Sequence, residues 1–235
     1  MRIKGLFQWV VCMGLLTAGL LLAGCAPDNT RLEFSYSPAP ATMELEAGSP
    51  ASVTVYEFGD DRQNQVYVGQ AMADYSNPLV SAVHYQTARP IGQVVTDAIV
   101  RSLESQGFRV VRASGWNLDP ATLRDITTEL VVGGKVKAFW VEAAPYFSSE
   151  SALVNIRVVI ADAAGKRILW EGDIVGSETF NTNTIEKAFS TKKPSPPELL
   201  QKAFSGAIDE LSRHPDIQRA LKSAMPQTIG LVMYF

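Results

Sequence analysis

The chain has 235 residues, of which 46% are hydrophobic and 19% charged. This composition excludes an intrinsically disordered protein and suits one ordinary folded domain. The formal net charge is −3, and no dense basic stretch occurs. The charge therefore gives no electrostatic reason to expect nucleic acid as a partner, and we expect none.

Residues 1–24 have the three parts of a secretory signal peptide. Arg2 and Lys4 form a positive start, residues 6–22 are almost wholly apolar, and two small residues follow. An uncleaved transmembrane helix is the alternative, because about 20 apolar residues span a bilayer. The small residues at the end of the run favour a cleaved leader.

The leader ends in Leu22-Ala23-Gly24-Cys25, which matches the bacterial lipobox, the site at which a thiol receives diacylglycerol before cleavage. We therefore predict lipidation of Cys25 and attachment to a membrane through that lipid, with residues 25–30 as a short tether. The other cysteine, Cys12, lies in the leader, so the mature domain has no internal disulfide. In the sorting rule of enteric lipoproteins, Asp after the cysteine retains the protein in the inner membrane. Because Ala26 stands there, the resemblance to enteric lipoproteins implies a location on the periplasmic face of the outer membrane. The inner membrane is the alternative.

Alternating and β-branched residues predict strands in the first part of the mature chain. Residues 31–36 alternate between apolar and polar side chains, and residues 52–58 are rich in valine and aromatic residues. Prolines between them indicate an irregular connection. Residues 66–68 and 79–80 are candidates for short strands.

Residues 90–106 predict an amphipathic helix, with Pro90 at its start and Gly107 after its last turn. Residues 108–111 predict the next strand, completing a strand–helix–strand unit. The connections lack a glycine-rich phosphate loop, which excludes a dinucleotide-binding fingerprint. The apolar stripe of the helix consists of Ile91, Val94, Val95, Ala98, Ile99 and Leu103.

The second half of the chain predicts a polar connection over residues 113–127, a long strand over residues 130–141, and then an antiparallel hairpin. Residues 154–160 and 168–174 form its arms, with one alternating set on the core face. That set includes Val158 and Ile160, and Val159 is assigned to the opposite face.

The chain closes with two predicted helices. Ser195 and Glu198 have the spacing of a capping box, and the helix that they open ends at His214. Asp216 is positioned to cap a short second helix that reaches residue 224. The apolar tail, residues 225–235, is expected to be a loose segment or a strand on the sheet edge.

These elements predict an α+β fold. We expect a single mixed or antiparallel sheet of about five strands, with two amphipathic helices packed on one face. The domain boundaries expected from the sequence are a leader over 1–24, a tether over 25–30, one domain over 31–224 and a tail over 225–235.

The order and spacing of several segments resemble the YajG-like family of bacterial envelope lipoproteins. The chain differs in a longer segment around residues 112–129 and in its apolar tail. The resemblance implies a lipoprotein that binds or supports another component, and it carries over no catalytic residues. The matching segments are Val53-Thr54-Val55, Asp61-Arg62, residues 90–111, residues 154–175, Ala207-Ile208-Asp209-Glu210-Leu211 and Asp216-Ile217.

Few residues are candidates for chemistry. His84 and His214 are the only histidines, and neither has a second ligand at metal spacing, so we expect no metal or cofactor. Asp60-Asp61-Arg62 is either a reactive carboxylate pair or a solvated strand end with a local ion pair, and we favour the second. No serine or cysteine nucleophile lies in a recognisable elbow, so we predict that the protein is not an enzyme.

Tyr146 and Phe147 are candidates for contact with a partner. They lie between two predicted strands, in a connection whose backbone is expected to reach solvent, and polar residues follow them. The alternative is that the connection folds over its own domain.

Three function classes remain open. The first is a non-enzymatic structural or accessory lipoprotein of an envelope assembly that acts through protein contacts. The second is a lipid-binding or small-ligand-binding auxiliary lipoprotein of an envelope ABC transport system, and the third is a hydrolase with an unrecognised site. An apolar pocket would favour the second class and a convergent polar cleft the third. We favour the first, with an envelope protein as partner.

Overall fold

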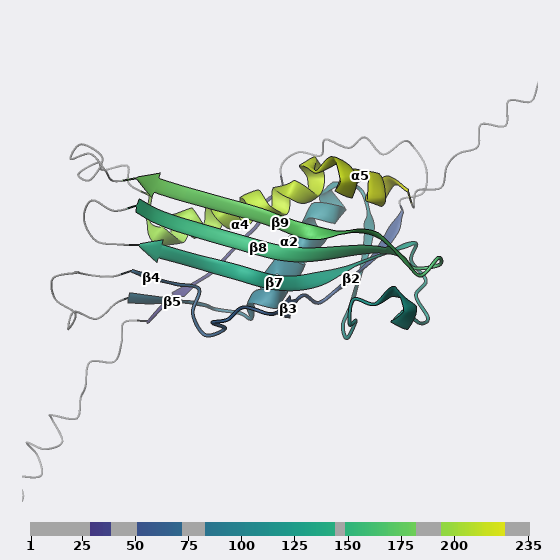
Figure 1. The fold of residues 1–235 in the computed structure, drawn as a ribbon, viewed down its shortest axis with the longest axis horizontal. Helices are drawn as coiled ribbons and strands as arrows, with labels where there is room; N and C mark the ends of the chain where they lie inside the picture. Colours follow the sequence, from purple (N-terminus) through teal and green to yellow (C-terminus); the bar gives the residue numbers. More distant parts are fainter. Residues whose placement is uncertain (1–28, 39–50, 72–82, 144–148, 182–193, 224–235) are drawn as a thin grey trace, which may run out of the picture.

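The computed structural model describes residues 29–38, 51–71, 83–143, 149–181 and 194–223 (Figure 1). None of the helices in these ranges is long and apolar enough to cross a membrane. Several expectations from the sequence lie outside the described residues: the leader 1–24, lipidation at Cys25, a strand at 79–80, the contact residues Tyr146 and Phe147, and the tail 225–235.

The described residues form one mixed sheet of nine strands and three α-helices. The strands are β1 (Asn29–Leu32), β2 (Ser52–Tyr56), β3 (Gly59–Asp60), β4 (Gly69–Ala71), β5 (Val83–Thr87), β6 (Arg109–Ala113), β7 (Leu130–Ala143), β8 (Ser149–Asp162) and β9 (Arg167–Asn181). The helices are α2 (Ile91–Ser105), α4 (Pro196–Arg213), α5 (Pro215–Lys222) and the 3₁₀ turn η1 (Pro120–Thr122).

Strand β7 organises the sheet. One of its edges pairs in parallel with β2, β3 and β4 in succession, and the other pairs antiparallel with β8, which pairs with β9. The long strands β7, β8 and β9 lie side by side, with α2 and α4 behind them (Figure 1). The α+β class and the mixed sheet are confirmed.

The expected number of about five strands is wrong, because several strands are too short to show a period in the sequence. Strand β3 has two residues and β4 has three. The predicted strand at 66–68 is also displaced. The side chain of Asn64 accepts hydrogen bonds from the backbone nitrogens of Val66 and Tyr67, at 3.1 and 3.0 Å, which folds this stretch into a turn. Strand β4 begins only at Gly69.

The first predicted strand has the expected alternation of burial, but its hydrogen-bonded part is shorter. Strand β1 begins at Asn29, inside the expected tether, and ends at Leu32. The following residues remain extended, with Phe34 and Tyr36 buried. Helix α4 holds this segment: the side-chain amide of Gln201 donates to the carbonyl of Ser35 at 2.7 Å. In this segment, a side chain of α4 therefore makes the backbone contact that a neighbouring strand would otherwise make.

Tyr36 is predicted to make unfolding sensitive to alkaline pH. Burial, and then its 2.8 Å hydrogen bond to Asp209 and the charge of that residue, raise the pKa of Tyr36 to about 12. An unfolded tyrosine titrates near 10. The neutral phenol therefore stabilises the fold fully below pH 10, and this contribution is lost as the pH rises from about 10 to 12.

The measurement is the urea midpoint of the wild-type protein and of Tyr36→Phe across this pH window. The wild-type midpoint should fall more steeply than that of the variant. Parallel curves for the two proteins would contradict the assignment, since the other tyrosines titrate equally in both.

Helix α2 matches the sequence prediction closely. Pro90 precedes its first residue, and Gly107 has a φ of 91°, a left-handed conformation that glycine adopts without strain. The predicted apolar stripe is buried against the sheet. Ile99 is fully buried within it.

Replacing Ile99 with Ala is expected to lower the free energy of unfolding by about 2–5 kcal/mol, because it removes buried methyl groups and leaves a cavity. Chemical denaturation measures this loss. Glu104→Ala, on the exposed side of the same helix, is the control and should change stability by less than about 0.5 kcal/mol. A near-neutral Ile99→Ala would contradict the burial of the stripe.

The predicted capping box opens α4. The backbone nitrogen of Ser195 donates to the carboxylate of Glu198 at 2.7 Å, and this bond holds the pKa of Glu198 below its ordinary value. His214 ends α4, as expected, and its Nδ1 accepts from the backbone nitrogen of Asp216 at 3.3 Å, capping α5. The expected cap at Asp216 is therefore wrong, because Asp216 lies within the first turn of α5. Helix α4 packs across β7, β8 and β9.

The hairpin of β8 and β9 is confirmed and is longer than predicted. The assignment of Val159 to a solvent face is wrong, because Val159 is buried. A second small core covers this end of the outer sheet face, where Leu123 of the 113–127 connection packs with Val131 and Ala161. The sheet is therefore covered on both faces at this end.

Candidate binding cleft and outer sheet surface

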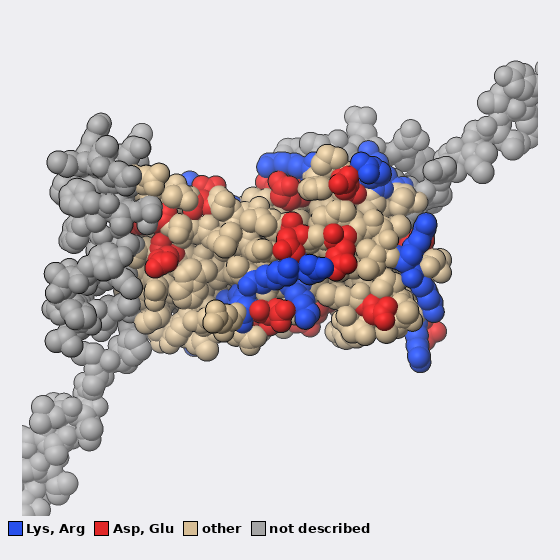
Figure 2. Space-filling view, in the orientation of Figure 1, with Lys and Arg blue, Asp and Glu red and all other residues tan. Residues whose placement is uncertain are grey.

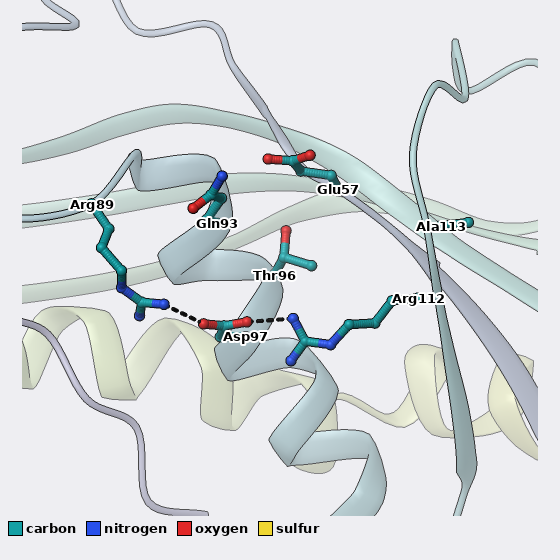
Figure 3. A pocket seen from close by; sticks show the side chains of 7 residues that line it. All are labelled: Glu57, Arg89, Gln93, Thr96, Asp97, Arg112 and Ala113. Atoms are coloured by element: carbon teal, nitrogen blue, oxygen red, sulfur yellow. Dashed lines mark hydrogen bonds and ion pairs between the residues drawn. The ribbon is translucent and has the colours of Figure 1, made fainter.

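A polar cleft of about 370 Å³ lies between α2 and the carboxyl ends of β2 and β6 (Figure 3). These two strands run parallel, and α2 starts at the same end of the sheet. Crevices at the carboxyl ends of parallel strands are the usual ligand sites of sheets covered by helices. The lining residues are Glu57, Arg89, Gln93, Thr96, Asp97, Arg112 and Ala113.

Asp97 lies between two arginines in the cleft (Figure 3). Its carboxylate contacts Nη1 of Arg89 at 2.7 Å and Nη1 of Arg112 at 2.5 Å. Burial raises the pKa of Asp97, but the hydrogen bonds and charges of Arg112 and Arg89 outweigh that effect, so its pKa lies below the ordinary value. Asp97 is therefore ionised at neutral pH and fixes both guanidinium groups.

Glu57, which follows β2, and Gln93, one turn before Asp97 on α2, also line the cleft (Figure 3). Within the described ranges, the carboxylate of Glu57 has no hydrogen-bond or ion-pair partner. Its backbone nitrogen donates to the carbonyl of Ala113 at 2.9 Å, which fixes its position. Thr96 supports the wall: its hydroxyl accepts from the backbone nitrogen of Phe58 at 3.0 Å and donates to the carbonyl of Gly92 at 2.7 Å.

Asp60-Asp61-Arg62, a candidate from the sequence, has a structural role. The expected local ion pair forms between Arg62 and Asp60. The expectation that it is solvated is wrong for Arg62, which is only 7% exposed. Its guanidinium donates two hydrogen bonds to the carboxylate of Asp60 in a bidentate contact, at 2.8 and 2.7 Å. It also donates to the backbone carbonyls of Tyr67 and Gln65. Arg62 thereby holds the loop between β3 and β4. Asp61 pairs separately with Lys135 at 3.6 Å.

The two histidines lie on different elements. His84 is in β5, with its ring 4.6 Å from that of Tyr67. His214 joins α4 and α5, with its ring 5.8 Å from that of Trp170. Among the residues that the structure places, no cluster of three or more His, Cys, Asp or Glu side chains could hold a metal ion.

The outer face of β7, β8 and β9, away from the helices, has a charged centre (Figure 2). Lys137 pairs with Asp173 at 3.0 Å, and Arg157 pairs with Glu171 at 2.6 Å. Each exposed pair contributes ~0–1 kcal/mol to stability. The pairs also keep this region polar.

Toward the end of β7 the outer face becomes mostly uncharged, to the left of the charged centre in Figure 2. We call Trp140, Leu153 and Val175 the outer apolar patch. Trp140 and Leu153 are cross-strand partners, while Leu153 and Val175 are 44% and 46% exposed. Exposed apolar side chains grouped on one surface are typical of a contact site.

Sequence reasoning did not identify the cleft. Its arginines and carboxylates come from the residue after β2, from the segment just before α2, from α2 itself and from β6, and no local motif contains them. The one available signal was an acidic residue, Asp97, on the polar side of the predicted helix.

The comparisons with known proteins concern the fold. No protein-family model matches the chain, and no curated protein sequence matches it significantly. A Xanthomonas campestris protein of the DUF330 family superposes with a TM-score of 0.52 at 11% identity, covering 83% of this chain and 98% of that one. The two proteins share a fold.

Two further solved structures are more distant. Lipoprotein GNA1162 from Neisseria meningitidis has a TM-score of 0.35 at 14% identity, covering 57% of this chain and 86% of that one. The PelC dodecamer from Paraburkholderia phytofirmans has a TM-score of 0.34 at 13% identity, covering 73% and 93%. The resemblance to the YajG-like family stays a prediction from the sequence.

Proposed function

We propose that this chain is a lipid-anchored envelope protein that acts by binding a protein partner, without enzymatic activity. The observation that carries the proposal is Leu22-Ala23-Gly24-Cys25 at the end of the apolar run. Strand β1 begins at Asn29, four residues after that cysteine. Even a fully extended connection of this length reaches only ~14 Å, so a lipid on Cys25 would hold the domain at the membrane surface.

Ala26 supports the periplasmic face of the outer membrane as the location. It occupies the position at which the enteric sorting rule places the inner-membrane signal Asp. The partner is then another envelope protein within reach of the anchored domain.

The outer apolar patch supports protein contact as the mode of action. Tyr146 and Phe147 belong to the connection between Ala143 of β7 and Ser149 of β8. Trp140 and Leu153 lie close to the same strand ends. Aromatic side chains dominate the binding energy of many interfaces. We propose that the partner contacts both the patch and these two aromatics.

The double substitution Tyr146→Ser with Phe147→Ser tests the proposal. A photo-reactive phenylalanine at Leu153 should cross-link the partner in cells, and the double variant should lose at least about nine-tenths of this product because its aromatic anchors are gone. Its urea midpoint should stay near the wild-type value.

Val111→Ser is the matched control. Val111 is similarly exposed but lies on β6, at the far end of the sheet order. It should leave the cross-link intact. A strong loss of stability in the double variant would instead place Tyr146 and Phe147 in the core of the domain and overturn the contact.

A further inference from the structure

We propose that the cleft beside α2 binds a small zwitterion, with its anionic group on Arg89 and Arg112 and its ammonium group at Glu57. This inference is independent of the protein contact proposed above, because the cleft and the outer apolar patch share no residues. It adds a small-ligand site to the domain.

The two arginines bind the anionic group of the ligand. Each arginine contacts Asp97 through its Nη1 atom, so the N–H groups on its other guanidinium nitrogens remain available for a ligand. The side chains are 50% and 56% exposed, which leaves them accessible. Because Asp97 already fixes both groups, a phosphate or carboxylate that they bind loses little affinity to ordering them.

The start of α2 favours an anion in the same place. Pro90 provides no side-chain cap, and the first turn has no acidic residue. The positive end of the helix dipole is therefore not neutralised by the helix's own side chains. Arg89 precedes this turn directly, so the dipole and the guanidinium act together.

Glu57 binds the ammonium group of the ligand. In the described structure its carboxylate has no partner, and it faces the cleft from the side opposite the arginines (Figure 3). The formal charges of Glu57, Asp97, Arg89 and Arg112 cancel. A ligand with both charges matches this arrangement, whereas a simple anion meets the repulsion of Glu57.

The size and lining of the cleft restrict the ligand further. A volume of about 370 Å³ is at the small end of ligand sites. Every lining side chain except that of Ala113 is polar or charged. An apolar ligand would leave those groups without hydrogen bonds. The chemical class is therefore a compact phosphate or carboxylate that also carries an amine.

Calorimetric titration of the full chain in a non-ionic maltoside detergent tests the site. Glycerophosphoethanolamine is the probe, with glycerol 3-phosphate as the anion alone and ethanolamine as the cation alone. We expect the zwitterion to bind at least tenfold more tightly than either fragment. No heat of binding for the zwitterion, or equal affinity for glycerol 3-phosphate, would overturn the proposal.

Two variants assign the ends of the ligand. Arg112→Gln should weaken the zwitterion and glycerol 3-phosphate by about tenfold each. Glu57→Gln should weaken only the zwitterion and so abolish the preference. Arg157→Gln, which breaks an ion pair on the outer face, is the control and should change neither affinity. Unchanged binding in Glu57→Gln would overturn the assignment of the ammonium group.

The source of the ligand is distinguished by competition. If dihexanoylphosphatidylethanolamine displaces the probe, the site accepts a lipid headgroup. If only glycerophosphoethanolamine and small amino acids bind, the site takes a free solute. Both results support a zwitterion site. Thermal unfolding of each variant is measured to check that the fold is intact.

Discussion

Cys25→Ser is expected to abolish lipid attachment. The predicted acceptor is the thiol of Cys25, directly after the apolar run of the leader, and a hydroxyl does not replace it in this modification. Mature lipoproteins carry three acyl chains, and each buried methylene contributes ~0.8 kcal/mol to membrane binding, so release of the wild-type protein should be negligible. The variant should remain an unprocessed precursor or become soluble.

Labelling of cells with radioactive palmitate measures this result, together with the mass of the purified protein. Cys12→Ser is the matched control, because Cys12 lies within the predicted leader. It should be labelled and processed normally. Palmitate label on Cys25→Ser would contradict the proposed anchor.

Gly176→Ala is expected to destabilise the domain severely. Gly176 lies in β9 beneath α4, and a Cβ at this position would lie 1.8 Å from the carbonyl oxygen of Ala203 and 2.7 Å from the backbone nitrogen of Ala207. Both atoms belong to the backbone of the helix, so no side-chain rotation relieves the clash. The helix must move away from the sheet.

We expect the substitution to lower the free energy of unfolding by about 3 kcal/mol or more, the upper range for overpacked cores. That is a large part of the total stability of an ordinary domain. Urea denaturation measures it. The control is Gly206→Ala in α4, where an added Cβ meets no atom within 4 Å. This change should stabilise the helix by ~0.5–1 kcal/mol. A stable Gly176→Ala protein would show that α4 does not pack so closely.

The sequence by itself determined the elements whose signals are local. The stripe of α2, the capping box at Ser195 and Glu198, and the turn between β8 and β9 each depend on residues within a few positions of one another. Such patterns are set by the helical and strand periods and by side-chain to backbone hydrogen bonds, so they are readable without the fold. The lipobox is also a local pattern, and lipidation of Cys25 stays a prediction from the sequence.

The tertiary structure alone decided the short strands and the cleft. Strands β3 and β4 exist because β7 offers them an unpaired edge, and two or three residues have no readable period. Val159 is buried opposite Gly133, over which Trp116 and Leu118 of the 113–127 connection lie. The cleft brings Glu57 to a helix and a strand more than thirty residues further along the chain. Pairing and packing between distant segments decide all three features, and local patterns do not encode such contacts.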